Sequence, residues 1–212
     1  TFILNMFNQL DISKNKLIDH EKYLRNNIFF TEKKWPHFNL IFKDIKKLSS
    51  KMPSSSKILF IERTNLYGGL SLFAPFFYKH KICSIDCSEK FIKSRGHYNK
   101  SLINIDKLIP FYSSKQISYN RTKFLKEKAD LIIIPNLIHH IPYHYSFLKN
   151  LKKNLNTNGK IYIFEPLIRE LHQIPNDYLR YTPYGLERLF IDLNFKNVSH
   201  NLEGGPFSVI SY

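Results

Sequence analysis

The chain has 212 residues, 43% of them hydrophobic, which is enough for one domain of ordinary size with a single core. No apolar run approaches the roughly 20 residues of a membrane span, and no segment resembles a signal peptide. Two cysteines, Cys83 and Cys87, have a spacing that matches no closed metal site or redox pair, so we expect no metal and a reducing, cytoplasmic location.

The formal net charge of +15 raises the hypothesis of a nucleic-acid partner, because clustered basic residues bind phosphate through counterion release. The lysines are spread over the whole length, however, with short pairs and no long basic tract. This distribution favours a solvated basic surface, and an RNA partner remains the less favoured interpretation.

The first 56 residues are predicted to form a helical cap. Five apolar residues recur with the spacing of one helical face, namely Phe38, Ile41, Phe42, Ile45 and Leu48. The Pro and Ser residues of 52–56 then end the pattern. Residues 57–212 are expected to form a single globular domain behind this cap.

From residue 57 onward, apolar strand patterns alternate with helical patterns. Strands are predicted at 57–61, 81–86, 108–114, 129–135 and 160–166, and helices at 88–98, 144–159 (ended by Gly159) and 186–195. This alternation predicts an α/β fold with a Rossmann-like, doubly wound and mostly parallel sheet. Two late segments, 196–201 and 206–212, flank a Gly-Gly turn and predict a hairpin that adds an antiparallel edge strand.

In such a sheet, ligands lie at the carboxyl ends of the strands, so the residues that follow each strand are candidates for binding. Asp86 ends the second predicted strand about twenty residues after the first loop, the spacing at which a carboxylate binds the hydroxyls of a ribose. The alternative is that Asp86 or Ser88 only caps the following helix.

Four pieces of the later sequence carry a family resemblance. An apolar-His-His segment spans Leu137 to Ile141, a turn ends at Gly159, and a strand ends at Glu165-Pro166. Asp177, Arg180 and Tyr181-Thr182 then precede a helix and an Asn194-Phe195 turn. In this order the pieces resemble the small, single-domain, class I S-adenosylmethionine-dependent methyltransferases, over roughly residues 57 to 212.

The resemblance implies S-adenosylmethionine as cofactor, but the first loop departs from the family's acid and Gly-x-Gly-x-Gly pattern. Phe60 occupies the place of the acid, and the glycines come late. Either the rebuilt loop still holds the cofactor, with Glu62 on its ammonium group, or the site has closed. The third strand is also followed by no acid. The expected cofactor contacts are Glu62, Arg63, Thr64, Asn65, Gly68, Gly69, Asp86, Cys87, Ser88 and Asn136.

Methyl transfer needs an aligned nucleophile and a base, so His139, His140 and Glu165 are the predicted catalytic residues. One of two adjacent histidines often packs inward instead. The acceptor side is predicted to contain His172, Asp177, Arg180 and Tyr181. Arg180 either binds an anionic or sugar-linked substrate or forms an ion pair with Asp177 that only fixes the loop.

These expectations combine into a methyltransferase acting on the oxygen or nitrogen of a small-molecule or glycan-linked acceptor. Two alternatives stay open: a non-catalytic relative that keeps the fold, and an RNA methyltransferase. The sequence specifies neither the acceptor nor the oligomeric state.

Overall fold

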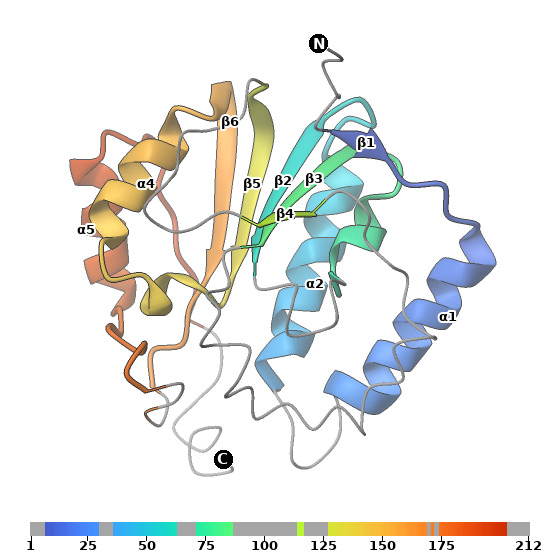
Figure 1. Cartoon of the computed structure of the whole chain (residues 1–212), viewed down its shortest axis with the longest axis horizontal. Coiled ribbons are helices and arrows are strands. Elements are labelled where there is room, and N and C mark those ends of the chain that lie inside the picture. Colours follow the sequence, from blue (N-terminus) through green and yellow to red (C-terminus); the bar gives the residue numbers. More distant parts are fainter. Residues whose placement is uncertain are drawn as a thin grey trace.

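The computed structural model describes residues 7–29, 36–62, 71–86, 114–116, 127–168, 171 and 174–202. In chain order the elements are β1 (Asn8–Gln9), α1 (Lys14–Leu24), a π turn (Arg25–Phe29), α2 (Pro36–Lys51), β2 (Lys57–Glu62), a 3₁₀ turn (Ala74–Phe77), β3 (Lys81–Asp86), β4 (Ser114–Gln116), β5 (Ala129–Pro135), a 3₁₀ turn (Ile138–His140), α4 (His144–Lys152), β6 (Leu155–Phe164) and α5 (Pro183–Asp192) (Figure 1).

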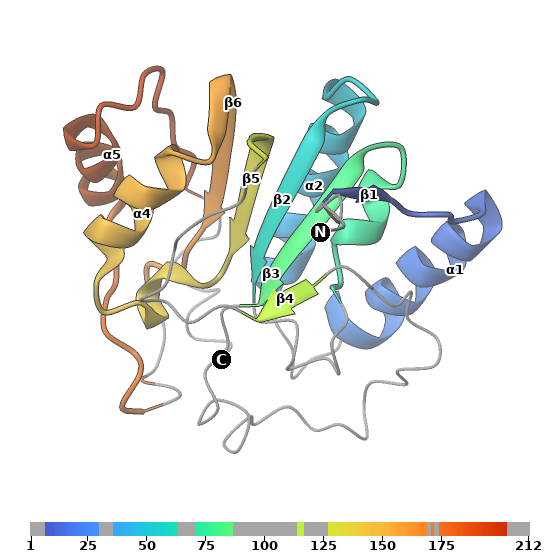
Figure 2. The same ribbon diagram turned by 45° about the horizontal axis from the view of Figure 1, so that its top comes forward.

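The strands form one mixed sheet with the order β1-β3-β2-β5-β6, and β4 also pairs with β3. β1 is antiparallel to β3, whereas the other pairs are parallel. Figure 2 shows β4 beside the end of β3, away from β5 and β6. The predicted Rossmann-like, mostly parallel sheet is therefore confirmed.

The antiparallel member comes from the N-terminal segment, not from residues 196–201, so that part of the hairpin prediction is wrong. Residues 196–201 contain no strand. Asn197 has a φ of 55°, which is incompatible with an extended strand, and Phe195 folds back so that its N–H donates to the carbonyl of Phe190 at 3.0 Å. The other predicted segment, 206–212, lies outside the described residues.

The predicted helix at 144–159 is too long, because α4 ends at Lys152 and Gly159 lies inside β6. The pairing of β5 with β6 is irregular just before this point, between Ala129 and Leu131. A Cβ atom at Gly159 would meet the carbonyl oxygen of Ala129 at 3.0 Å and a methyl of Leu155 at 2.9 Å. The glycine therefore allows close approach within the sheet rather than ending a helix.

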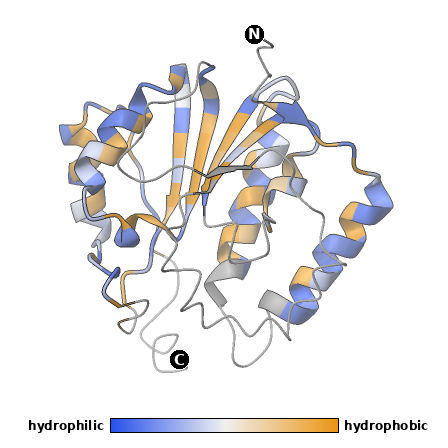
Figure 3. Ribbon diagram, viewed as in Figure 1, coloured by the Kyte–Doolittle hydropathy of each residue, from blue (hydrophilic) through white to orange (hydrophobic). Residues whose placement is uncertain are grey.

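Alternating residues of β2 divide the core between the two faces of the sheet. Ile58 and Phe60 pack with α1, α2 and the Ala74–Phe77 turn, whereas Leu59 and Ile61 pack with α4 and α5. Apolar strand residues occupy the centre of the molecule in Figure 3. Within the described ranges, no helix combines the length and apolar character needed to cross a membrane.

Candidate functional site

The carboxyl ends of β2 and β3 bring two acidic residues together. Glu62 and Asp86 are partners in the parallel register of these strands. The Glu62 side chain is buried, and its Oε1 accepts a long hydrogen bond of 3.4 Å from Ser84 Oγ. The two predicted cofactor contacts therefore lie at one edge of the sheet.

β2 lies between β3 and β5, so the strand order reverses beside it. At the end of β5, the buried Asn136 adopts a φ of 54°, and its N–H donates to the carbonyl of Phe164 at 2.7 Å. Asparagine tolerates this left-handed conformation better than most residues. Glu62, Asp86 and Asn136 therefore surround the switch point at which α/β proteins bind ligands.

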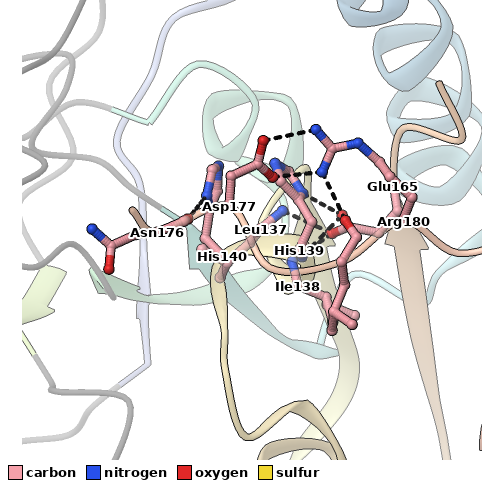
Figure 4. A network of polar contacts seen from close by, with 9 residues as sticks. Leu137, Ile138, His139, His140, Glu165, Asn176, Asp177 and Arg180 are labelled. Atoms are coloured by element: carbon pink, nitrogen blue, oxygen red, sulfur yellow. Dashed lines mark hydrogen bonds and ion pairs between the residues drawn. The ribbon is translucent and has the colours of Figure 1, made fainter. Parts of the chain in front are cut away.

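Glu165 follows β6, and its carboxylate accepts hydrogen bonds from the turn after β5. Its Oε1 accepts the backbone N–H groups of Leu137 at 2.8 Å and Ile138 at 2.6 Å, and its Oε2 accepts the N–H of His139 at 3.3 Å (Figure 4). Its Oε2 also contacts His139 Nδ1 at 2.5 Å. The carboxylate, only 3% exposed, is thus occupied by the turn that it holds.

The predicted histidine pair belongs to this turn and is buried. His139 and His140 are 1% and 0% exposed, and their ring centroids lie 3.9 Å apart. His140 Nδ1 donates to the carbonyl of Asn176 at 2.5 Å, and the carbonyl of His139 accepts the N–H of Tyr178 at 2.8 Å. The pair therefore joins the end of β5 to the segment before α5.

Asp177 and Arg180 form the ion pair that was one of the two predicted alternatives. Arg180 binds the two carboxylate oxygens through separate nitrogens, at 2.5 and 2.8 Å. Its guanidinium also donates to the carbonyl of Leu179 at 2.7 Å. The Asp177 side chain is 1% exposed, so the pair fixes the segment 177–180 from inside the protein.

Tyr181 lies next to this network. Within the described part of the chain, its buried hydroxyl has no hydrogen-bond partner. Burial, followed by the negative charge of Glu165, raises the pKa of the Tyr181 hydroxyl well above its ordinary value. The ring contacts that of His144 at 5.6 Å between centroids, and burial lowers the pKa of the His144 imidazole.

The structure gathers the predicted residues into two groups. Glu62, Asp86 and Asn136 lie at the switch point, and the second group lies around the turn after β5 and the segment before α5, namely His139, His140, Glu165, Asp177, Arg180 and Tyr181. The remaining predicted residues lie outside the described part, namely Arg63, Thr64, Asn65, Gly68, Gly69, Cys87, Ser88 and His172.

Sequence reasoning missed Ser84 and Asn176. Ser84 points from the middle of β3 toward Glu62, and its position two residues before Asp86 was the available indication, since alternate strand residues share a face. Asn176 acts through its backbone carbonyl, which no residue type reveals.

One family model and several solved structures are similar to this chain. Residues 68–163 match the family described as methyltransferase domain. Among solved structures, the CurJ carbon methyltransferase is 14% identical with a TM-score of 0.51, over 79% of this chain and 49% of that one. This chain thus spans about half the length of that protein.

Two further solved structures are similar to this chain with lower scores. A SAM-dependent methyltransferase from Aquifex aeolicus is 15% identical over 82% of this chain and 87% of that one, with a TM-score of 0.45. Coclaurine N-methyltransferase bound to N-methylheliamine and SAH is 12% identical over 74% and 45%, with a TM-score of 0.41. The search of curated proteins returned no match. Residues 68–163 are thus similar to a methyltransferase domain, and the chain shares the overall fold of the CurJ carbon methyltransferase structure.

Proposed function

We propose that this chain is an S-adenosylmethionine-dependent methyltransferase that acts on a small-molecule or glycan-linked acceptor. The observation that carries the proposal is the register of Glu62 and Asp86 at the carboxyl ends of two neighbouring parallel strands, beside the switch point. The match of residues 68–163 to a methyltransferase domain supports the choice of cofactor.

The chemistry of these two residues fits the cofactor. S-adenosylmethionine carries a cationic amino acid end and a ribose with two hydroxyls, and carboxylates are acceptors for both. Glu62 would hold the ammonium group and Asp86 the ribose. Asn136, at the end of β5, is assigned to the same side of the site.

The bound cofactor supplies an activated methyl group for transfer to an oxygen or nitrogen of the acceptor. On the acceptor side, the chain would contribute side chains that its own hydrogen bonds already hold in place. Glu165 fixes the turn 137–139 and the ring of His139, so we assign it a positioning role. The predicted proton acceptor, His139 or His140, would have to reach the acceptor from a buried position.

Calorimetric titration with S-adenosylmethionine and S-adenosylhomocysteine tests this proposal. We expect saturable binding of both by the wild-type chain and a loss of at least tenfold in affinity for Asp86→Asn and for Glu62→Gln. Asp19→Asn, an exposed carboxylate on α1, is the matched control and should bind like the wild type.

Three results would contradict parts of the proposal. Absence of cofactor binding would favour the non-catalytic alternative. Unchanged affinity in both variants would overturn the assignment of the ligands. Methylation of RNA by the cofactor-bound protein, at salt concentrations that abolish nonspecific binding, would move the acceptor from a small molecule to nucleic acid.

A further inference from the structure

Three buried side chains on the acceptor side converge on one point. His139, His140 and Asp177 each present a ligand atom, and these atoms all lie within 4.8 Å of one another (Figure 4). Two imidazoles and a carboxylate form a donor set that suits first-row divalent metal ions. We propose that this cluster binds one such ion, and the inference stands whether or not the chain transfers methyl groups.

Each imidazole contacts an oxygen acceptor through Nδ1, as metal-binding histidines commonly do. His139 Nδ1 faces the carboxylate of Glu165, and His140 Nδ1 faces the carbonyl of Asn176, both at 2.5 Å. Ionised carboxylates and carbonyls only accept hydrogen bonds, so each Nδ1 carries the hydrogen and a neutral ring then has its lone pair on Nε2. Metal-ligating histidines commonly donate their second ring N–H in this way. The Nε2 atoms are therefore the proposed ligands.

The charge of the cluster favours a cation. Glu165 and Asp177 contribute two negative charges and Arg180 one positive charge, so with neutral imidazoles the set carries one net negative charge in a buried environment. Arg180 approaches the two oxygens of Asp177 at 2.5 and 2.8 Å, and two carboxylate oxygens offer about four lone-pair directions, so coordination by one oxygen is compatible with this ion pair. The ion pair would hold the carboxylate in place while one oxygen coordinates.

Metal binding requires the three ligand atoms to move closer together. Nitrogen and oxygen ligands about 2.0–2.2 Å from one metal lie about 3–3.5 Å apart, whereas one ring nitrogen of each histidine and an oxygen of Asp177 lie within 4.8 Å of one another, so the side chains would have to turn to bring the ligand atoms closer. Nitrogens bound to metal cannot accept a proton, so metal binding would replace the predicted base role of His139 and His140. The expectation of no metal rested on the two cysteines, neither of which belongs to this cluster.

Titration of the chelator-treated chain with Co²⁺, followed by visible absorption, tests the site without any cofactor. We expect d–d bands that saturate at one equivalent and disappear on addition of Zn²⁺. His140→Ala and Asp177→Asn should each weaken binding at least tenfold. Glu165→Gln keeps all three proposed ligands but alters the contact to His139 Nδ1 and the hydrogen bonds of the turn, and it should weaken binding about 10–100-fold. His200→Ala, a partly exposed histidine that pairs with Glu187, is the control and should bind as the wild type does.

Circular dichroism verifies that each variant is folded. If His140→Ala fails to fold, Asp177→Asn and a thermal unfolding series of the wild type with increasing Zn²⁺ decide the matter. The proposal requires a midpoint that rises with Zn²⁺ concentration. Absence of stoichiometric Co²⁺ binding, a midpoint that Zn²⁺ does not raise, or equal affinity in the folded variants would show that the cluster is only a hydrogen-bonded network.

Discussion

Glu165 and His139 lie 26 residues apart in the chain, yet the carboxylate contacts the imidazole Nδ1 at 2.5 Å and the N–H of the same residue at 3.3 Å. Together with the N–H groups of Leu137 and Ile138, these contacts tie the end of β6 to the turn that follows β5. The sequence pattern suggested Glu165 as a catalytic residue, but four hydrogen bonds occupy its carboxylate. In this geometry the carboxylate fixes the turn, and a catalytic role for Glu165 stays a prediction.

Replacement of Glu165 by Ala should lower the free energy of unfolding by about 2–4 kcal/mol, because buried N–H groups would lose their acceptor. Urea unfolding at neutral pH, followed by circular dichroism, measures the change. Glu165→Gln keeps one oxygen as an acceptor and should cost less. Equal stability of the wild type and Glu165→Ala would mean that the turn does not depend on this carboxylate.

Gly159→Ala should destabilise the protein by about 1–3 kcal/mol, because the new methyl group would lie too close to the carbonyl of Ala129 and the side chain of Leu155. Thr157→Ala, at an exposed position of the same strand segment, is the control for a substitution that adds no atom inside the sheet. Thermal or urea unfolding of both variants separates the effects. Similar stabilities would show that the sheet shifts to accept the methyl group.

His20 predicts a pH dependence of stability. Burial lowers the pKa of its imidazole despite the hydrogen bond of Nε2 with the carbonyl of Leu72 at 3.0 Å. The unfolded chain therefore binds more protons than the folded chain below the ordinary histidine pKa of about 6.5, so stability falls as the pH falls through that value. Urea unfolding between about pH 7.5 and 5 should show this slope.

His20→Gln removes the titrating group but keeps a donor for the carbonyl of Leu72. The variant should be less stable than the wild type at neutral pH. Its free energy of unfolding should also fall less steeply as the pH is lowered. His200→Gln, at a partly exposed position, should retain the slope of the wild type. A His20→Gln variant with an undiminished slope would assign the effect to other groups, among them His144, whose pKa burial also lowers.

The strands could be predicted because their apolar runs are continuous, and β2, β3 and β5 lie where the pattern placed them. The end of α4 could not, because Gly159 is typical of a helix end and its actual reason, the approach of Ala129, depends on a strand 30 residues earlier. The same limit applies to the site. Residue types predicted the histidines and acids, whereas the backbone acceptors and donors that orient them become visible only in the fold.

Asp130 offers a second example of a carboxylate that binds backbone. At the start of β5, its Oδ2 accepts the N–H of Lys57 at 2.8 Å and its Oδ1 accepts the side-chain amide of Asn156 at 2.6 Å, so it joins the beginnings of β2 and β6. Asp130→Ala should lower the free energy of unfolding by about 1–3 kcal/mol, because hydrogen bonds to a charged acceptor are lost.

Glu127→Ala is the matched comparison, because Glu127 forms an ion pair of 2.6 Å with the side chain of the same Lys57 and the Glu127 side chain is 28% exposed. Partly exposed ion pairs contribute little, so this variant should cost less than about 1 kcal/mol and less still at high salt. Urea unfolding of both variants at low and high salt makes the comparison. If Glu127→Ala were as destabilising as Asp130→Ala, the ion pair rather than the backbone contact would be what holds the start of β2, since both carboxylates act on the same lysine.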